Sequence, residues 1–229
     1  TSTPTARLLL QSGKEESLMR FHPWVFSGAI YRMEGSPAEG DLVDVYTSER
    51  QFIARGHYQI GSITVRILSF VEEAIDQRWW NARIRAAYRM REALGLAENP
   101  QTTCYRRVHG EGDSLPGLVV DIYGRTAVIQ CHSVGMYRSR KAIGEALREV
   151  FGDRLTALFD KSGGTLPYNA GLGAQAGYLW GEPAKTENPV LENGCLFRVN
   201  WEQGQKTGFF IDQRENRELV RRYAKGRTV

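Results

Sequence analysis

The sequence is poor in cysteine, and the few cysteines are far apart. Only Cys104, Cys131 and Cys195 occur among 229 residues, and no two of them form a Cys-x-x-Cys pair. The odd number argues against a disulfide framework, because disulfides use cysteines in pairs, and the wide spacing argues against a zinc site, whose cysteine ligands are closely spaced. The four histidines show no ligand spacing either, so we expect no metal. Buried, reduced thiols are the expected state of the cysteines.

Long apolar runs are also missing, and the first residues lack the basic-then-apolar layout of a signal peptide. We therefore expect a cytoplasmic protein with no membrane partner. The excess of charge is small, since 30 Lys and Arg against 26 Asp and Glu give a net charge of +4. Such a balance permits nucleic-acid binding without indicating it. A hydrophobic content of 41% is typical of a globular chain of one large domain or two small ones.

Residues 1–75 are dominated by short β-type runs, at 41–46, 51–58 and 63–70, that are separated by glycine-containing turns. They predict a small barrel or sandwich. Ahead of these runs lies an aromatic and polar segment that contains Arg20 and His22. Its side chains could pack against the barrel or contact RNA, and we keep Arg20 and His22 as RNA-binding candidates.

Residues 76–94 form the clearest predicted helix, with Asp76 as its cap and Gly95 as its stop. Arg78, Arg85 and Arg89 are spaced by seven and four residues, which places them on one stripe. A stripe of guanidinium groups could follow RNA phosphates. The alternative is a solvated helix face, which is the more common origin of such a stripe.

The segment that follows predicts a compact α+β domain with a mostly antiparallel sheet. Two β-rich runs joined through Gly124 and Arg125 predict a hairpin. The expected elements in chain order are a strand at 104–109, the hairpin strands at 118–123 and 126–131, a helix at 137–150 and a strand at 155–160.

Two glycine-containing loops in this domain carry no predicted chemistry. The acidic residues within 111–117 lie among Gly and Pro, so a turn is favoured over a pair of catalytic carboxylates. The glycines of 163–181 lack the Gly-x-Gly-x-x-Gly spacing of a dinucleotide site, and a flexible loop is expected there.

The last part of the chain contains the densest polar motif. A hairpin turn at Asn193 and Gly194 leads into a strand at 195–201, so we do not nominate Cys195 for catalysis. Residues 204–217 then join glycines to amides, a hydroxyl and cations, and Asp212 is expected to cap the next helix. Such a loop suits an anionic or planar ligand, although an ordinary capped helix after a polar loop explains the same residues.

The motif Gly-Gln-Lys-Thr-Gly-Phe-Phe-Ile-Asp-Gln-Arg, at 204–214, resembles the start of the catalytic domain in the ribosomal RNA large subunit methyltransferase I family. The run Gly-Glu-Gly-Asp-Ser-Leu-Pro-Gly-Leu-Val-Val-Asp-Ile-Tyr-Gly, at 110–124, is similar to that family's middle domain. The run His-Pro-Trp-Val-Phe-Ser-Gly-Ala-Ile, at 22–30, resembles a PUA domain, a small β-barrel attached to RNA-modifying enzymes. The loop at 163–181 departs from the charged stretch expected in the family.

The resemblance implies an α+β multidomain fold with three parts. These are an N-terminal PUA-type small β-barrel at 1–75, a middle α+β domain at 76–184, and at 185–229 the hairpin and first helix of a truncated, Rossmann-like α/β methyltransferase domain. The implied cofactor is S-adenosyl-L-methionine, whose main binding loop is expected beyond Val229. The residues implied to line the cofactor and substrate pocket are Gln205, Lys206, Thr207, Gly208, Asp212, Gln213 and Arg214.

The implied parent enzyme methylates C5 of cytosine in ribosomal RNA, after a cysteine thiolate adds to C6. Neither catalytic cysteine is expected within this chain, so we predict a segment that binds ribosomal RNA but is inactive by itself. Two alternatives stay open, a non-enzymatic RNA-binding protein with a PUA domain and an enzyme that modifies another RNA base. A homodimer also stays open.

Overall fold

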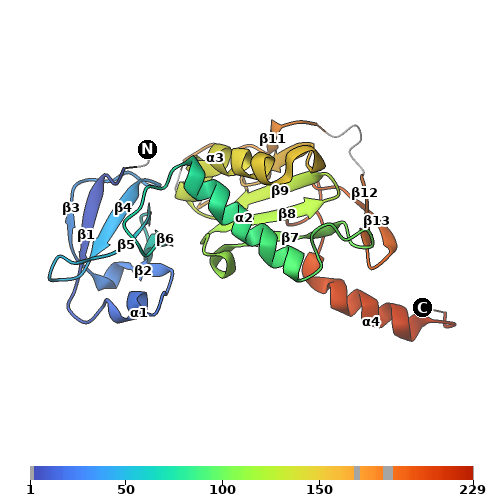
Figure 1. The fold of residues 1–229 in the computed structure, drawn as a ribbon, viewed down its shortest axis with the longest axis horizontal. Helices are drawn as coiled ribbons and strands as arrows, with labels where there is room; N and C mark the ends of the chain where they lie inside the picture. Colours follow the sequence, from blue (N-terminus) through green and yellow to red (C-terminus); the bar gives the residue numbers. More distant parts are fainter. Residues whose placement is uncertain (1–2, 168–170, 183–187, 229) are drawn as a thin grey trace.

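The chain folds as three successive parts, which Figure 1 shows from the N-terminal sheet on one side to helix α4 on the other. The computed structural model describes residues 3–167, 171–182 and 188–228. The predicted domain boundaries at 75 and 76 and at 184 and 185 stay predictions, and the second of these lies outside the described residues. Within the described residues, no helix is both long enough and apolar enough to cross a membrane.

The N-terminal part is a six-stranded sheet in the order β2-β6-β5-β4-β1-β3. Only the β1–β4 pair is parallel among its pairings. Its edge strands, β2 and β3, are separated by a single 3-10 turn, η1, so the sheet has to curl until its edges come near each other. Its elements are β1 (Ala6–Leu10), α1 (Glu16–Met19), β2 (Trp24–Phe26), η1 (Ser27–Ala29), β3 (Ile30–Glu34), β4 (Leu42–Tyr46), β5 (Phe52–Tyr58) and β6 (Ile63–Ser69).

The three strands predicted for this part are confirmed as β4, β5 and β6 within one residue at each end. Alternating apolar residues such as Leu8, Leu10, Val43 and Val45 fill the inside of the curled sheet. Gly56 lies at a bulge in β5, where a Cβ atom would come within 2.2 Å of a backbone oxygen of β6. The close approach of the two strands therefore requires glycine.

The middle part is a five-stranded sheet in the order β11-β10-β9-β8-β7, with two long helices on one face (Figure 1). Among the strands that the structure describes in this sheet, only β9 and β10 run parallel, and α3 forms the crossover between them. The mostly antiparallel prediction is thus confirmed. The elements are α2 (Gln77–Ala93), β7 (Cys104–His109), η2 (Gly110–Asp113), β8 (Leu118–Tyr123), β9 (Thr126–Cys131), α3 (Val134–Phe151), η3 (Gly152–Arg154), β10 (Ala157–Asp160) and β11 (Gly177–Trp180).

Most local predictions for this part hold. Asp76 caps α2 by accepting a hydrogen bond from the Trp79 backbone N–H at 3.0 Å, and Gly95 follows the helix with a φ of 66°. The predicted turn at 111–117 is also present. The glycine-rich loop is the exception, because its end forms β11, which pairs with the edge of β10. The Tyr178 hydroxyl donates to Glu202 at 2.7 Å, so a tertiary contact fixes a segment that sequence chemistry describes as a loop.

The last part covers the other face of the middle sheet. It contains β12 (Asn188–Glu192), β13 (Cys195–Val199), η5 (Ile211–Gln213) and α4 (Arg214–Ala224). The β12–β13 hairpin at Asn193 and Gly194 is confirmed, and Trp201 packs against Tyr123 of β8 at 6.0 Å between ring centres. All three cysteines are free, but Cys195 is only half-buried, unlike the other two. Helix α4 projects away from the body of the molecule (Figure 1).

The N-terminal sheet contacts the middle part through α2 and α3. The His57 ring of β5 is buried, stacks over Trp80, and lies where a Cβ atom at Gly135 would come within 2.2 Å of it. At the same interface, the Trp24 indole N–H donates to Glu111 at 3.0 Å. The absence of a side chain at Gly135 thus allows the N-terminal sheet and α3 to pack closely on the two sides of the His57 ring.

Candidate functional site at residues 204–217

The polar motif begins with a tight turn that needs glycine. The backbone N–H of Gly204 donates to Asn200 at 2.9 Å, and that of Gly208 donates to Gln205 at 2.8 Å. Gly208 has a φ of 133°, and a Cβ atom there would lie 2.7 Å from the Cα atom of Trp201. Only glycine fits such a backbone without strain. The turn therefore has a defined backbone conformation that depends on glycine, and it is not a flexible linker.

Thr207 joins this turn to the middle sheet. Its buried hydroxyl donates to the Asp121 carboxylate at 2.6 Å and lies 2.8 Å from the Tyr123 hydroxyl. Because Thr207 donates its proton to Asp121, the Tyr123 hydroxyl is the donor to Thr207. Burial is the main cause that raises the pKa of Tyr123, which keeps it a donor. A chain of hydrogen bonds thus runs from β8 into the motif.

Asp121 also binds Arg106, which is next to it across the β7–β8 pair. The Arg106 guanidinium donates to both carboxylate oxygens, at 2.9 and 3.1 Å, and this hydrogen bonding raises the pKa of Arg106. A fully buried carboxylate is stable only with such partners. Asp121 therefore fixes Arg106 on one side and Thr207 on the other.

Lys161 fixes the turn through its side-chain ammonium group. Its ammonium group donates to the backbone carbonyls of Trp201 and Gly204, and burial lowers the pKa of Lys161. These carbonyls belong to a turn, so the half-buried ammonium group of Lys161 can satisfy their need for a hydrogen-bond donor. Lys161 lies in the run Phe159-Asp160-Lys161-Ser162 and thus supports residues that follow it by 40 and 43 positions in the sequence.

The end of the motif is fixed by two arginines. Arg214 donates to the backbone carbonyl of Cys104 at 3.1 Å, and Arg217 binds the buried carboxylate of Glu192 at 2.6 and 2.7 Å. Hydrogen bonding to Glu192 is the main cause that raises the pKa of Arg217. These contacts bind the start of α4 to β7 and β12. Arg214 is therefore a structural residue as well as a candidate for ligand contact.

The predicted capping role of Asp212 is wrong. A 3-10 turn, η5, comes before α4, so Gln213 takes the N-cap position, and no side chain of the described residues caps the helix. Asp212 is exposed, and a hydrogen bond from the Gln213 amide is the main cause that lowers its pKa. The extra turn arises because Ile211 is drawn into the apolar layer under the sheet. Gln205 and Lys206 are likewise exposed.

A hollow of about 430 Å³ lies between the end of α2, η2 and η5. Asp212 and Arg214 are the only members of the predicted pocket set that line it. They lie there with Arg106 and His109. Its apolar lining residues are Met90, Leu94, Leu96 and Ile211. An apolar floor with guanidinium and carboxylate groups at its rim suits a planar ligand that carries charge.

The remaining pocket candidates do not line that hollow. Thr207 and Gly208 are used in the turn itself, whereas Gln205 and Lys206 are on its outer surface. Gln213 is exposed at the N-cap position of α4. Sequence reasoning also missed Arg106, Asp121 and Lys161. Asp121 carries a signal that could have revealed it, because a carboxylate stands in the middle of an otherwise apolar strand. Lys161 lies in the run Phe159-Asp160-Lys161-Ser162, which resembles the middle domain of the family and could have revealed it, whereas Arg106 has no comparable signal.

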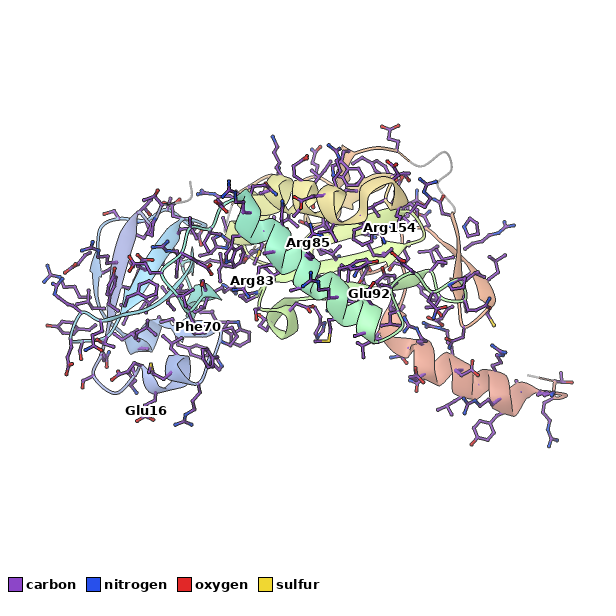
Figure 2. The ribbon with its side chains drawn as sticks, viewed as in Figure 1. Glu16, Phe70, Arg83, Arg85, Glu92 and Arg154 are labelled. Carbon is purple, nitrogen blue, oxygen red and sulfur yellow. The ribbon has the colours of Figure 1, made fainter. Side chains whose placement is uncertain are left out.

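The RNA-binding candidates form two separate groups. Arg78, Arg85 and Arg89 share one exposed face of α2, where Arg85 also pairs with Glu149 at 2.7 Å. Arg20 is exposed and pairs with Glu16 on the N-terminal part. Figure 2 shows Glu16 and Arg85 far apart, on different parts of the molecule. The two groups thus belong to different surfaces.

His22 completes the second group. Its ring is half-buried, with one nitrogen 3.3 Å from the Trp24 backbone and an edge contact to the Trp24 indole. Among the described residues, no group of three or more His, Cys, Asp and Glu has a geometry that could hold a metal ion.

Comparison with known proteins defines the class of the N-terminal part first. Residues 8–70 match a family model described as a PUA-like domain. A putative S-adenosylmethionine-dependent methyltransferase from Streptococcus mutans superimposes with a TM-score of 0.77 at 22% identity, over 93% of this chain and 53% of that one. The predicted fold class, a PUA-type domain joined to a mixed α and β chain, is confirmed.

Sequence comparison then gives the relatives. The chain is 37% identical over 227 residues to a ribosomal RNA large subunit methyltransferase I from Erwinia tasmaniensis, and 36% identical to one from Yersinia pseudotuberculosis. The match covers 98% of this chain and 56% of each relative, so the chain spans about half the length of the curated relatives it matches. The resemblance to the ribosomal RNA large subunit methyltransferase I family is thereby confirmed.

Proposed function

We propose that this chain is the RNA-recognition part of an S-adenosylmethionine-dependent ribosomal RNA (cytosine-C5) methyltransferase. The observation that carries the proposal is the 37% identity to a relative of that name, which extends over 98% of the chain. The PUA-like domain supports it, because such domains accompany RNA-modifying enzymes. By itself the chain binds RNA and transfers no methyl group.

The exposed arginines of α2 are proposed to contact phosphates. Arg78, Arg85 and Arg89 line a shallow hollow and present their charge on one face. The Arg85–Glu149 pair is about half exposed, and such pairs contribute little, so a phosphate can replace the carboxylate. Arg20 and His22 are proposed to contact RNA on the PUA-like domain. Each contact would release counterions and make binding sensitive to salt.

The motif at 204–217 is proposed to form one wall of the cofactor and substrate pocket. S-adenosylmethionine supplies the methyl group when bound, and its charged ends suit the residues present. The Asp212 carboxylate can accept hydrogen bonds from an ammonium or a ribose hydroxyl, and the Arg106 and Arg214 guanidinium groups can bind a carboxylate. Gln205 and Lys206 offer further donors on the outer surface of the turn, and Gln213 offers its side-chain amide at the start of α4. Thr207 and Gly208 fix its shape.

Titration of the chain against ribosomal RNA fragments at several salt concentrations tests the proposal, with binding of labelled S-adenosylmethionine measured in parallel. Salt-sensitive RNA binding without tight cofactor binding is expected. Tight cofactor binding would contradict the division into recognition and catalytic parts. Absence of RNA binding would leave the PUA-like domain as a fold without that role. Finding another modified base in RNA treated with the longer protein would favour an enzyme of different specificity.

Substitution of Lys206 by Ala tests the pocket wall when it is made in the longer methyltransferase of which this chain is proposed to be the RNA-recognition part. Lys206 is exposed, and its ammonium lies over the Phe210 ring at 4.6 Å. We expect lower turnover at an unchanged melting temperature. Arg214→Ala is the comparison, because it removes a hydrogen bond to the sheet and should lower both turnover and stability. Unchanged turnover in Lys206→Ala would remove this residue from the pocket.

The same proposal places the protein in the cytoplasm, where ribosomal RNA is modified. It also leaves a surface for a homodimer. Leu219, Val220 and Tyr223 of α4 are 47%, 59% and 80% exposed, and form an apolar side on a projecting helix. Sedimentation of the chain over a range of concentrations distinguishes a dimer from a monomer.

A further inference from the structure

Arg107 is a buried cation on the helix-covered face of the middle sheet. Its side chain is fully buried, with an exposed fraction of 0%. The guanidinium carbon lies 4.4, 5.0 and 4.5 Å from the ring centres of Tyr88, Tyr105 and Phe151. Three rings around one guanidinium give favourable cation–π contacts. They supply no negative charge.

The hydrogen-bonding capacity of Arg107 is mostly unused. One terminal nitrogen donates to the Tyr105 hydroxyl, whereas Nε and the other terminal nitrogen are buried without a partner among the described residues. Burial is the main cause that lowers the pKa of Arg107, to about 10. A buried cation without a carboxylate is costly, so an anion near it would stabilise the protein.

A hollow of about 250 Å³ lies next to this cation. The same three rings that surround Arg107 line it, so the guanidinium is directly behind its wall. Arg125 and Arg154 lie at the rim with a single carboxylate, Glu98. Two guanidinium groups at the rim, with Arg107 behind the aromatic wall, outnumber this one carboxylate and leave a positive excess around the hollow. The hydroxyl-bearing lining residues are Tyr88, Thr102, Thr103 and Tyr105.

The two rim arginines differ in availability. Arg154 is occupied, because it donates to the backbone of Val150 and Phe151, to the Tyr88 hydroxyl and to Glu98. Arg125 is exposed and donates one hydrogen bond to the Asp153 backbone carbonyl at 2.6 Å, which leaves other N–H groups for a ligand. Figure 2 shows Arg154 on the side of the middle part that faces away from the N-terminal sheet.

We propose that this hollow binds a nucleotide, with its phosphate at Arg125 and its base against the aromatic wall that separates the hollow from the charge of Arg107. The site differs from the hollow at residues 211–214, with which it shares no lining residue. Phosphate is the anion that best matches several guanidinium groups. Aromatic side chains stack on bases of any sequence. The proposal does not depend on methyl transfer, and the nucleotide can be free or part of RNA.

Thermal unfolding of the chain with uridine 5′-monophosphate tests the site. We expect a melting temperature that rises with nucleotide concentration, and a smaller rise with inorganic phosphate alone. Arg107→Leu should melt higher than the wild type without ligand, because it removes an uncompensated charge, and should bind the nucleotide roughly tenfold more weakly. Arg125→Ala, at an exposed position, should show the same weakening. Arg32→Ala, an exposed arginine of the N-terminal sheet, is the matched control.

The results decide the proposal whether or not Arg107→Leu folds, since Arg125→Ala gives an independent readout. No nucleotide response in the wild type overturns the site, and so does an equal response in Arg125→Ala. An equal response to inorganic phosphate overturns the role of the rings. Competition with a labelled RNA oligonucleotide then separates the two sources. Displacement by the nucleotide assigns the site to RNA, and unchanged RNA binding assigns it to free nucleotide.

Discussion

Arg106 and Arg107 are neighbours on β7, yet their side chains lie on opposite faces of the middle sheet and have different partners. Arg106 points to the face covered by the last part of the chain, where Asp121 binds it through two hydrogen bonds. Arg107 points to the face covered by α2 and α3, where it meets aromatic rings and no carboxylate hydrogen-bonds to it among the described residues. One guanidinium has its pKa raised and the other lowered.

The comparison teaches that a buried charge is informative when its partners are counted. The Arg106 network is complete, and it serves to hold the 204–208 turn against the sheet. The Arg107 site is incomplete, which is the reason for assigning it a ligand.

Removal of the Asp121 carboxylate should have the largest effect. Asp121→Ala leaves Arg106 without its partner and Thr207 without its acceptor, so we expect a loss of about 3–5 kcal/mol of unfolding free energy. Urea unfolding measures it. Asp153→Ala, at an exposed position, is the control and should change little. A loss below about 1 kcal/mol for Asp121→Ala would show that the network does not hold the turn.

Acid should lower the stability of the protein by weakening the interface between the N-terminal sheet and the helices. Burial is the main cause that lowers the pKa of His57 to about 4, from 6.5. The unfolded chain therefore binds the proton first, and stability present above pH 6.5 falls between pH 6.5 and 4 by up to about 3 kcal/mol. Burial also lowers the pKa of His132, which adds to the same decline.

His57→Asn tests the assignment, because it should be less stable at pH 7.5 but lose less stability on going to pH 4.5. His132 accounts for the part of the decline that remains. Urea unfolding at the two pH values measures both effects. Equal losses in the wild type and the variant would show that His57 is protonated equally in the folded and unfolded states.

Substitution of Gly208 by Ala should destabilise the turn by about 1–3 kcal/mol, because it forces a Cβ atom against Trp201 at a φ of 133°. Gly164→Ala is the matched control, since a Cβ atom there meets nothing within 4 Å. Hydrogen exchange of the backbone at 201–208 should rise in Gly208→Ala only. Identical unfolding curves for the two variants would contradict the tight turn.

The smallest effect on stability is expected at the α2 stripe. Arg89→Ala should change the unfolding free energy by less than about 0.5 kcal/mol, because the side chain is exposed. It should nevertheless reduce the salt slope of RNA binding by about 1. Arg32→Ala should leave the slope unchanged. A slope that is unaffected by Arg89→Ala would identify the stripe as a solvated helix face.

Local chemistry predicted the regular elements well. The Asp76 cap, the hairpin through Gly124 and the apolar spacing of α2 and α3 depend on residues near one another in sequence, and each is present. Strand β11 and the cap of α4 were not predicted correctly. Tyr178 and Ile211 decide these two segments through contacts with distant parts of the chain. No local pattern carries that information.

The sequence alone determined the family resemblance, the PUA-like domain and the position of the polar motif, because these depend on residue order and short-range spacing. Tertiary structure alone decided which motif residues are used internally. Thr207 hydrogen-bonds to Asp121 and Arg214 to Cys104, because the pairing of β7 with β8 brings these two partners to the motif. Lys206 and Asp212 remain exposed. Tertiary structure also decided that the adjacent residues Arg106 and Arg107 have different surroundings, because successive side chains of a strand point to opposite faces of the sheet.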